Sequence, residues 1–184
     1  MSGPKSDAAL IVIDVQKAFD DPRWGPRNNP DAERNIARLL DRWRRDGRPV
    51  IHVKHDSVDP RSLLRPGLPG NEIKEEALPA GGEPLLHKCV NSAFIGTDLE
   101  ARLRAMGVTD VVAVGITTNH CVSTTVRMAA NLGFRAFVVS DATATFGMVS
   151  PAGRSYTADE MHDMGLAELS GEFATIVTTA QLLT

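Results

Sequence analysis

Short, continuously apolar runs recur along the chain, and each is bounded by turn-forming residues. They occupy residues 9–14, 49–54, 83–88, 111–115, 136–142 and 174–179. Within them, polar and apolar residues do not alternate as they do in a strand with one solvated face. Runs of this kind are typical of strands buried on both faces, which is the environment of a parallel sheet.

Segments with helical periodicity separate these runs. They span residues 30–45, 98–106, 121–132 and 157–169. Gly47, Gly107 and Gly133 follow the first three segments, and glycine commonly ends a helix. The repeated order of strand, helix and strand predicts a doubly wound α/β fold with right-handed crossovers. With 184 residues, of which 42% are hydrophobic, the chain is expected to form a single domain over residues 1–184.

The charge and the cysteine content argue against several classes of protein. The formal net charge is −3, and Lys and Arg are spread among Asp and Glu, so nucleic-acid binding is not expected. No stretch reaches the roughly 18 apolar residues that a membrane span requires. Cys89 and Cys121 give no disulfide framework, although the sequence leaves open that they pair. We expect a reduced, cytoplasmic protein that binds neither membranes nor nucleic acids.

Residues 55–82 interrupt the alternation of strands and helices. The segment is rich in Pro and Gly and has no periodicity. A loop of this length in a compact domain is usually functional or disordered. His55 and the stretch LRPGLPGNEIK are therefore candidates for a lid or for a contact with a neighbouring subunit.

Three residues that carry chemistry stand at or just after the ends of expected strands. Asp14 and Lys88 each end an apolar run, and Cys121 lies where a helix is expected to begin. Ligands of open α/β sheets bind beyond the carboxyl ends of the strands, so these residues are candidates for one site.

The three side chains together would make a nucleophilic site. A thiol is mostly protonated at neutral pH, and a helix N-terminus and a nearby ammonium both lower its pKa. Lys88 would then favour a Cys121 thiolate, while Asp14 would accept the thiol proton and return it to a leaving amine. Taken one at a time, the carboxylate can be a cap, the Lys solvated and the Cys a small buried apolar residue. The residues alone leave a catalytic and a structural cysteine both open.

Three motifs carry a resemblance to a known family. They are LIVIDVQKAF at 10–19, HKCVNSAFIGTDLEARLRAMG at 87–107 and GITTNHCVSTTVRMAANLGFRAFVVSDATATF at 115–146. In this order the chain resembles the isochorismatase-like cysteine hydrolases, which include nicotinamidases, N-carbamoylsarcosine amidohydrolase and ureidoacrylate amidohydrolases. The resemblance implies a six-stranded, mainly parallel sheet with helices on both faces, and a homodimer or higher homo-oligomer.

The resemblance also implies the parts of the site. It assigns a catalytic triad to Asp14, Lys88 and Cys121, and a cis peptide bond between Ile116 and Thr117. The backbone N–H groups of Thr117 and Cys121 would then form an oxyanion hole. We expect a hydrolase of non-peptide C–N bonds that takes a small-molecule amide, ureide or carbamoyl compound through a thioester, without a cofactor.

A metal site is not expected. Nicotinamidases carry an Asp-x-His pair and a further His after the second strand, whereas this chain has HVKHDSVDP there. His52, His55 and Asp56 do not stand in that order, and His52 falls inside an expected strand, where a packed histidine is the simpler interpretation. Without that metal site, nicotinamide is a poorer candidate for the substrate.

Further residues near the expected strand ends are candidates for substrate binding. They are Phe19, Trp24, Phe94, Asn119, His120 and Phe146. The aromatic ones have the alternative of simple packing, and Trp24 that of a subunit interface. Gln16 is a candidate to support Asp14 by hydrogen bonding.

Other functions remain open at this point. Isochorismatases proper cleave an enol ether and lack the cysteine, so Cys121 favours amide over ether chemistry. A redox-active thiol protein would couple Cys121 to Cys89, but the chain has no CxxC motif. A binding subunit without catalysis is the remaining alternative. Linear ureas, biuret-like compounds, small carboxamides and antibiotic lactams all fit the expected chemistry.

Overall fold

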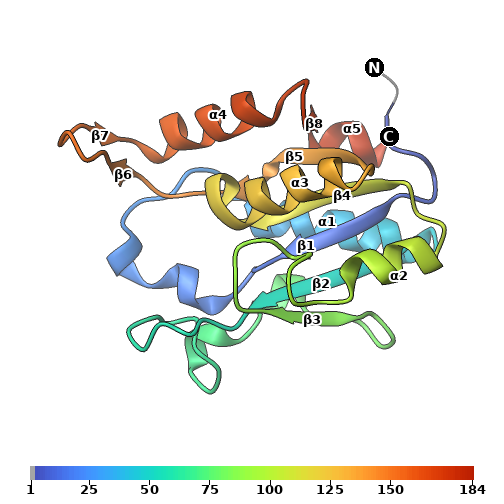
Figure 1. The fold of residues 1–184 in the computed structure, drawn as a ribbon, viewed down its shortest axis with the longest axis horizontal. Helices are drawn as coiled ribbons and strands as arrows, with labels where there is room; N and C mark the ends of the chain where they lie inside the picture. Colours follow the sequence, from blue (N-terminus) through green and yellow to red (C-terminus); the bar gives the residue numbers. More distant parts are fainter. Residues whose placement is uncertain (1–2) are drawn as a thin grey trace.

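The computed structural model describes residues 3–184, which are built around one six-stranded parallel sheet (Figure 1). Its strands follow the order β3-β2-β1-β4-β5-β8, and every neighbouring pair is parallel. The strands are β1 (Ala9–Ile13), β2 (Val50–His55), β3 (Leu85–Lys88), β4 (Asp110–Ile116), β5 (Arg135–Ala144) and β8 (Ala174–Val177). The apolar runs of the sequence form this sheet, so the predicted doubly wound, six-stranded, mainly parallel α/β fold is confirmed.

Helices cover both faces of the sheet. They are α1 (Ala32–Arg45), α2 (Leu99–Ala105), α3 (Ser123–Asn131), α4 (Ala158–Leu169) and α5 (Thr179–Leu183). Helices α1 and α5 pack into one core cluster, and α2, α3 and α4 pack into the other. The periodicity predicts α1 to α4 but misses α5 and the antiparallel hairpin of β6 (Met148–Val149) and β7 (Ser155–Tyr156). Within residues 3–184, no helix combines the length and the apolar character that crossing a membrane requires.

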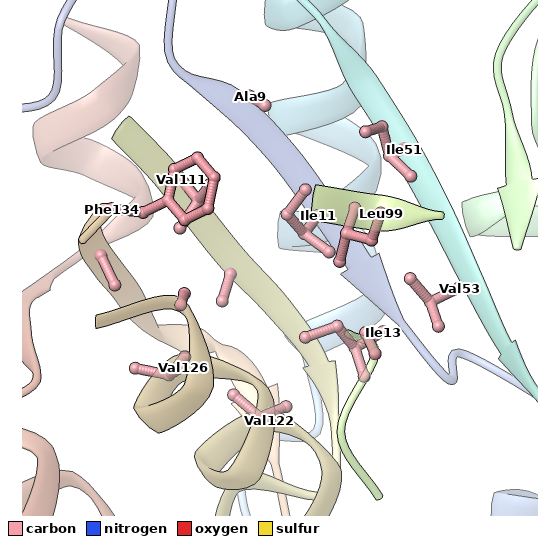
Figure 2. Packing of buried hydrophobic residues seen from close by; sticks show 14 of the residues in the cluster. Ala9, Ile11, Ile13, Ile51, Val53, Leu99, Val111, Val122, Val126 and Phe134 are labelled. Atoms are coloured by element: carbon pink, nitrogen blue, oxygen red, sulfur yellow. The ribbon is translucent and has the colours of Figure 1, made fainter. Parts of the chain in front are cut away.

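Alternate residues of β1 enter opposite cores. Ile11 and Ile13 join the cluster that contains Val126 of α3, and Figure 2 shows them on that face. Leu10 and Val12 join the cluster on the α1 face. All four β1 residues are at most 2% exposed, and burying each such side chain contributes about 1.5–3 kcal/mol. The central strand is therefore held from both sides, which fixes the position of the residue that follows it.

The direction of strand addition reverses between β1 and β4. Strands β2 and β3 extend the sheet on one side of β1, and the chain then returns to place β4 on the other side. Such a reversal is where ligands of open α/β sheets bind. The two strands run very close at Gly115, where an added Cβ would lie 1.9 Å from the Ile13 carbonyl oxygen and φ is +130°. Glycine is therefore required at this position.

The segment 55–82 folds back against the rest of the molecule. Its short 3-10 turns are η3 (Pro69–Asn71) and η4 (Glu75–Ala77). Asn71 is buried, and its Nδ2 donates to the carbonyl oxygens of His55 at 3.0 Å and Leu64 at 2.7 Å. One buried amide thus ties the middle of the segment to its beginning, so the segment is ordered in spite of its composition.

Candidate active site

Asp14, Lys88 and Cys121 meet at the carboxyl ends of the strands. Asp14 directly follows β1, Lys88 is the last residue of β3, and Cys121 lies in a π-helical turn after β4 (Thr118–Val122). Lys88 Nζ donates to Asp14 Oδ2 at 2.6 Å and to Cys121 Sγ at 3.3 Å. The structure thus brings together the three residues that the sequence singles out, although α3 begins only at Ser123 and not at Cys121.

The strand order explains why these residues meet. Asp14 and Cys121 follow neighbouring strands at the point where the order reverses. Lys88 starts two strands away from β1, and its long aliphatic stem lets the ammonium reach past the end of β2. Its side chain is 0% exposed, so surrounding residues hold the ammonium in place.

His55 is a fourth residue at this site. It is the last residue of β2 and pairs in register with Lys88. Its Nδ1 lies 2.9 Å from Lys88 Nζ and 4.0 Å from Asp14 Oδ2. From the sequence, His55 is a candidate for a lid, a subunit contact or a metal ligand, and this contact is not predicted. The available signal is that His55, like Asp14 and Lys88, stands at the end of an apolar run.

Gln16 fixes the main chain of His55. Its Oε1 accepts from the His55 N–H at 2.9 Å, and its Nε2 donates to the carbonyl oxygens of His55 and Asn71 at 3.1 and 2.9 Å. The main-chain N–H of Gln16 donates to the Asp14 carbonyl oxygen at 2.9 Å, so the predicted hydrogen bond to Asp14 is made by the main chain and not by the side chain. The side-chain amide instead holds the main chain of His55 and Asn71.

Burial determines the protonation of the thiol. Burial, and after it the negative charge of Asp14, raises the pKa of the Cys121 thiol to about 12, and Lys88 opposes this only in part. Burial also raises the pKa of Asp14, against the lowering effect of Lys88. The expectation of a thiol with a lowered pKa is wrong, because the cost of burying the thiolate beside a carboxylate outweighs the attraction of the ammonium.

Asp14 has one oxygen free to receive that proton. Oδ2 accepts from Lys88, whereas Oδ1 is buried and accepts no hydrogen bond from residues 3–184. Ligand atoms of Asp14, His55 and Cys121 lie within 4.8 Å of one another. A neutral thiol beside a carboxylate of raised pKa is an arrangement suited to general-base catalysis of a sulfur nucleophile.

The turn that carries Cys121 is closed by the carbonyl oxygen of Thr117. This oxygen accepts from the N–H groups of His120 and Val122, both at 3.2 Å. The Ile116–Thr117 peptide bond that precedes the turn is cis. The turn places the backbone of Cys121 at the carboxyl end of β4.

Three of the aromatic candidates form one cluster. Ring centroids of Phe19 and Trp24 lie 5.5 Å apart, as do those of Trp24 and Phe146, and Phe19 and Phe146 lie 6.1 Å apart. Phe19 and Phe146 also pack with Ile116, which precedes the cis bond. The Trp24 indole donates to the Ala18 carbonyl oxygen at 2.8 Å, which fixes the ring. We call Phe19, Trp24 and Phe146 the aromatic cluster.

The remaining candidates lie outside the aromatic cluster. Phe94 stacks on Phe134 with a centroid distance of 6.0 Å and is part-buried against the core. The Asn119 amide accepts from Thr145 Oγ1 at 2.5 Å and donates to Met148 Sδ at 3.2 Å, so it links the residue after β5 to β6. His120 is exposed beside Cys121.

The residues considered for a metal site are engaged with other partners. His52 is buried in β2, and its Nε2 lies 2.8 Å from Glu83 Oε2. Asp56 accepts from Asn71 Nδ2 through one oxygen and lies 2.8 Å from His87 Nδ1 with the other. These donors do not fit the metal set of a nicotinamidase.

A second set of ligand types includes two of the three candidate catalytic residues. Asp14, His55 and Cys121 offer oxygen, nitrogen and sulfur within 4.8 Å, which are donors that zinc accepts. The Lys88 ammonium contacts all three residues, so the cation of this site is supplied by the chain.

Comparison with known proteins agrees with this fold and these motifs. The isochorismatase domain matches residues 8–181. The chain is 51% identical over 175 residues to the isochorismatase family protein YrdC of Bacillus subtilis, covering 95% of this chain and 94% of that protein. It is 31% identical over 188 residues to Nicotinamidase 3 of Arabidopsis thaliana, covering 95% and 86% of the two chains.

A solved structure is similar over the full length. The isochorismatase-family crystal structure from Chromobacterium violaceum superposes with a TM-score of 0.95 at 47% identity, covering 100% of this chain and 97% of that one. The sheet order, the family match and this superposition agree along the chain. The chain therefore belongs to the isochorismatase family of hydrolases.

Proposed function

We propose that the protein is a cysteine-dependent hydrolase that cleaves a C–N bond of a small amide, ureide or carbamoyl compound through a thioester. The observation that carries the proposal is the buried ammonium of Lys88, which contacts both Asp14 Oδ2 and Cys121 Sγ. A carboxylate, an ammonium and a thiol in contact are the groups that covalent acyl transfer needs.

The first step joins the enzyme to the acyl group. Asp14 takes the thiol proton as Cys121 Sγ attacks the carbonyl carbon, so a C–S bond forms and the carbonyl oxygen becomes an oxyanion. The N–H groups of Thr117 and Cys121 stabilise that oxyanion. The raised pKa of the thiol supports a proton transfer that accompanies attack rather than a thiolate formed beforehand.

The second step releases the amine and the third releases the acid. Asp14 returns its proton to the nitrogen as the C–N bond breaks, so ammonia or an amine leaves and a thioester remains. Asp14 then takes a proton from water as the water oxygen attacks the thioester carbon. The C–S bond breaks, the acid or carbamate leaves, and Cys121 regains its proton.

Lys88 favours the ionised form of Asp14. Its ammonium opposes, without cancelling, the rise that burial causes in the pKa of the carboxyl group, and a carboxylate of raised pKa is a stronger base. The same ammonium faces sulfur and offsets the negative charge that develops there during attack. Lys88 therefore acts through electrostatics and transfers no proton in this mechanism.

The aromatic cluster supports an uncharged, flat acyl group. Its rings lie next to Ile116 at the start of the proposed oxyanion turn, and among its members only the Trp24 indole carries a polar atom, which is already bonded. Rings of this kind favour planar, apolar groups. Nicotinamidase 3, a relative that covers most of this chain, is named for an amide of that kind. Because the chain does not match the metal-binding residues of nicotinamidases, we propose the class of small amides and ureides rather than nicotinamide itself.

Exposed apolar residues support assembly into a homodimer or a higher homo-oligomer. Met148 and Val149 of the hairpin are 41% and 67% exposed, and Met164 of α4 is 41% exposed. Contact with a second copy would remove this apolar surface from water. Cys89 and Cys121 are both free thiols, which supports a reducing, cytoplasmic location.

The test is a screen of small carboxamides, linear ureas and biuret-like compounds for ammonia release. The wild-type protein should release ammonia from members of one class, and Cys121→Ala should release none above background. Cys89→Ala is the matched control, because Cys89 is the other cysteine, is exposed and should be dispensable. Mass spectrometry of quenched reactions should show an acyl adduct on Cys121.

Two outcomes would contradict the proposal. Full turnover by Cys121→Ala would show that Cys121 is not the nucleophile. Cleavage of isochorismate with no activity on any amide or ureide would favour the enol-ether alternative.

A further inference from the structure

The Lys88 ammonium has a third contact that the proposed mechanism does not use. Besides Asp14 Oδ2 and Cys121 Sγ, its Nζ lies 2.9 Å from His55 Nδ1. An ammonium has three N–H donors and no acceptor, so each hydrogen has one partner here. His55 Nδ1 must then be the acceptor, which places the ring hydrogen on Nε2 and leaves the imidazole neutral.

The surroundings keep His55 neutral. Burial, and after it the charge of Lys88, lowers the pKa of His55 to about 4, against a smaller opposing effect of Asp56. The imidazole is therefore an uncharged acceptor at neutral pH. It accepts from the ammonium without competing with Asp14 as a counter-ion.

The fold holds His55 rigidly in this position. Its main-chain N–H and carbonyl are both bonded by the Gln16 amide, and the carbonyl also accepts from Asn71. Its side chain is 14% exposed, and the residue pairs in register with Lys88 on the neighbouring strand. These hydrogen bonds fix the main chain of His55, and so they hold its Nδ1 acceptor in place beside Lys88.

We propose that His55 is a positioning residue that orients the Lys88 ammonium, so that its other two N–H groups point at Asp14 and Cys121. This inference rests on the proposed function in one respect only, namely that the Cys121 sulfur acts as the nucleophile. Without the acceptor, the ammonium turns away from sulfur, and the developing thiolate loses part of its stabilisation. The cluster is a tetrad in which the fourth member adds geometry and no charge.

The test compares two substitutions at position 55. In His55→Asn, the side-chain oxygen can take the place of Nδ1 and accept from Lys88, whereas His55→Leu fills similar space without an acceptor. Alkylation of Cys121 by iodoacetamide, followed by mass spectrometry of its peptide across pH, reports thiol reactivity without any substrate. We expect His55→Leu to slow alkylation about tenfold at pH 8, equal to a rise of about one pKa unit, and His55→Asn to stay close to wild type.

Equal alkylation profiles for wild type and His55→Leu, or faster alkylation of His55→Leu, would overturn the proposal. A loss of the same size in His55→Asn would indicate a packing role and would overturn it as well. Because the assay uses no amide, a failure here is distinct from a failure to hydrolyse amides.

A second measurement covers the case in which His55→Leu does not fold. Nitrogen NMR of the histidine-labelled wild-type protein at neutral pH should show His55 with a bare Nδ1 and a protonated Nε2. A hydrogen on Nδ1, or a charged ring, would contradict the assignment.

Discussion

Two clusters in this protein each hold a buried carboxylate against a buried lysine ammonium, and they differ in how completely that carboxylate is paired. At the second cluster, Glu33 in the first turn of α1 accepts from Arg27 through both oxygens and from Lys74 Nζ at 2.6 Å. Lys74 also contacts Asp20. We call these four residues the structural cluster and contrast them with the active-site cluster of Asp14, His55, Lys88 and Cys121.

The pKa values of the two buried carboxyl groups, Glu33 and Asp14, shift in opposite directions. Burial by itself raises the pKa of both. For Glu33, the hydrogen bonds from Arg27 and Lys74 outweigh burial and lower the pKa to about 2. For Asp14, one ammonium does not outweigh burial, and the pKa rises. Two cations on two oxygens make a carboxylate that stays ionised, whereas one cation leaves a carboxylate that can take up a proton.

The contrast teaches where to look for chemistry in a fold with several buried ion pairs. Asp14 Oδ1 finds no hydrogen-bond partner among residues 3–184, whereas both Glu33 oxygens are paired. A buried acceptor left unpaired costs stability, and such positions are concentrated at functional sites. Incomplete pairing, rather than burial or charge, separates the active-site cluster from the structural cluster.

The largest expected effect comes from the same substitution made in each cluster. Lys88→Met should lower hydrolysis on the order of 10³-fold, because it removes the cation that faces both the base and the sulfur. Lys74→Met should leave the chemical step nearly unchanged and destabilise the fold, because it strips one cation from Glu33. Steady-state kinetics and urea unfolding of both variants check this. Comparable kinetic losses in the two variants would mean that the clusters do not differ in role.

Lys88→Met should also create a site for a divalent transition-metal ion. It leaves oxygen, nitrogen and sulfur ligands of Asp14, His55 and Cys121 within 4.8 Å and without their ammonium. Titration with Co²⁺ should then produce a sulfur-to-cobalt absorption band, which is absent from wild type and from Lys88→Met combined with Cys121→Ala. No band in Lys88→Met would show that the ammonium does not occupy a cation position.

Glu33→Gln should destabilise the protein by about 3 kcal/mol at pH 7, from a folded pKa of about 2 against an ordinary value of 4.5. The folded pKa is lowered, so this stability is fully present above about pH 4.5 and is lost as pH falls toward 2. Urea unfolding at pH 7 and pH 3 measures the difference in the free energy of unfolding between wild type and variant, which should be smaller at pH 3. A difference that does not change with pH would indicate that Glu33 stabilises the fold by packing rather than by its charge.

The raised pKa of Asp14 predicts an acid limb in the pH profile of kcat/KM above the usual aspartate range. Asp14 must be ionised to take the thiol proton, so activity falls about tenfold per pH unit below its pKa. The limb should persist in Glu33→Gln, because Glu33 belongs to the other cluster. An acid limb within the ordinary aspartate range would show that Lys88 outweighs burial.

The smallest effect is expected at the rim of the structural cluster. Asp20 contacts Lys74, but its side chain is 63% exposed. Solvent screens such a contact, so Asp20→Asn should cost only about 0.5 kcal/mol in the free energy of unfolding. Urea unfolding of Asp20→Asn, measured together with Glu33→Gln, checks this prediction. A loss of stability as large as that of Glu33→Gln would mean that the exposed Asp20 matters as much as the buried Glu33.

The sequence predicts the sheet and much of the candidate site but not the electrostatics of that site. The strand-end positions of Asp14, Lys88 and Cys121 suffice to predict that they meet, because parallel strands share their carboxyl edge. His55 stands at the same edge and escapes notice, because its role depends on which atom its ring presents to Lys88. Phe94 and Asn119 look like the other pocket candidates, yet their contacts lie with Phe134, Thr145 and Met148.

The sequence alone determines the order of the six sheet strands and of helices α1 to α4, through apolar runs that need cover on two faces, and the identity of the three central residues. The tertiary structure decides the pKa directions, the His55 contact and the engagement of Gln16. These depend on desolvation and on pairing between groups distant along the chain, such as Asp14 and Lys88, which are 74 residues apart. Burial acts on a thiol or a carboxyl group only once the chain has folded around it, so no local pattern records that Cys121 is a neutral thiol beside a half-paired carboxylate.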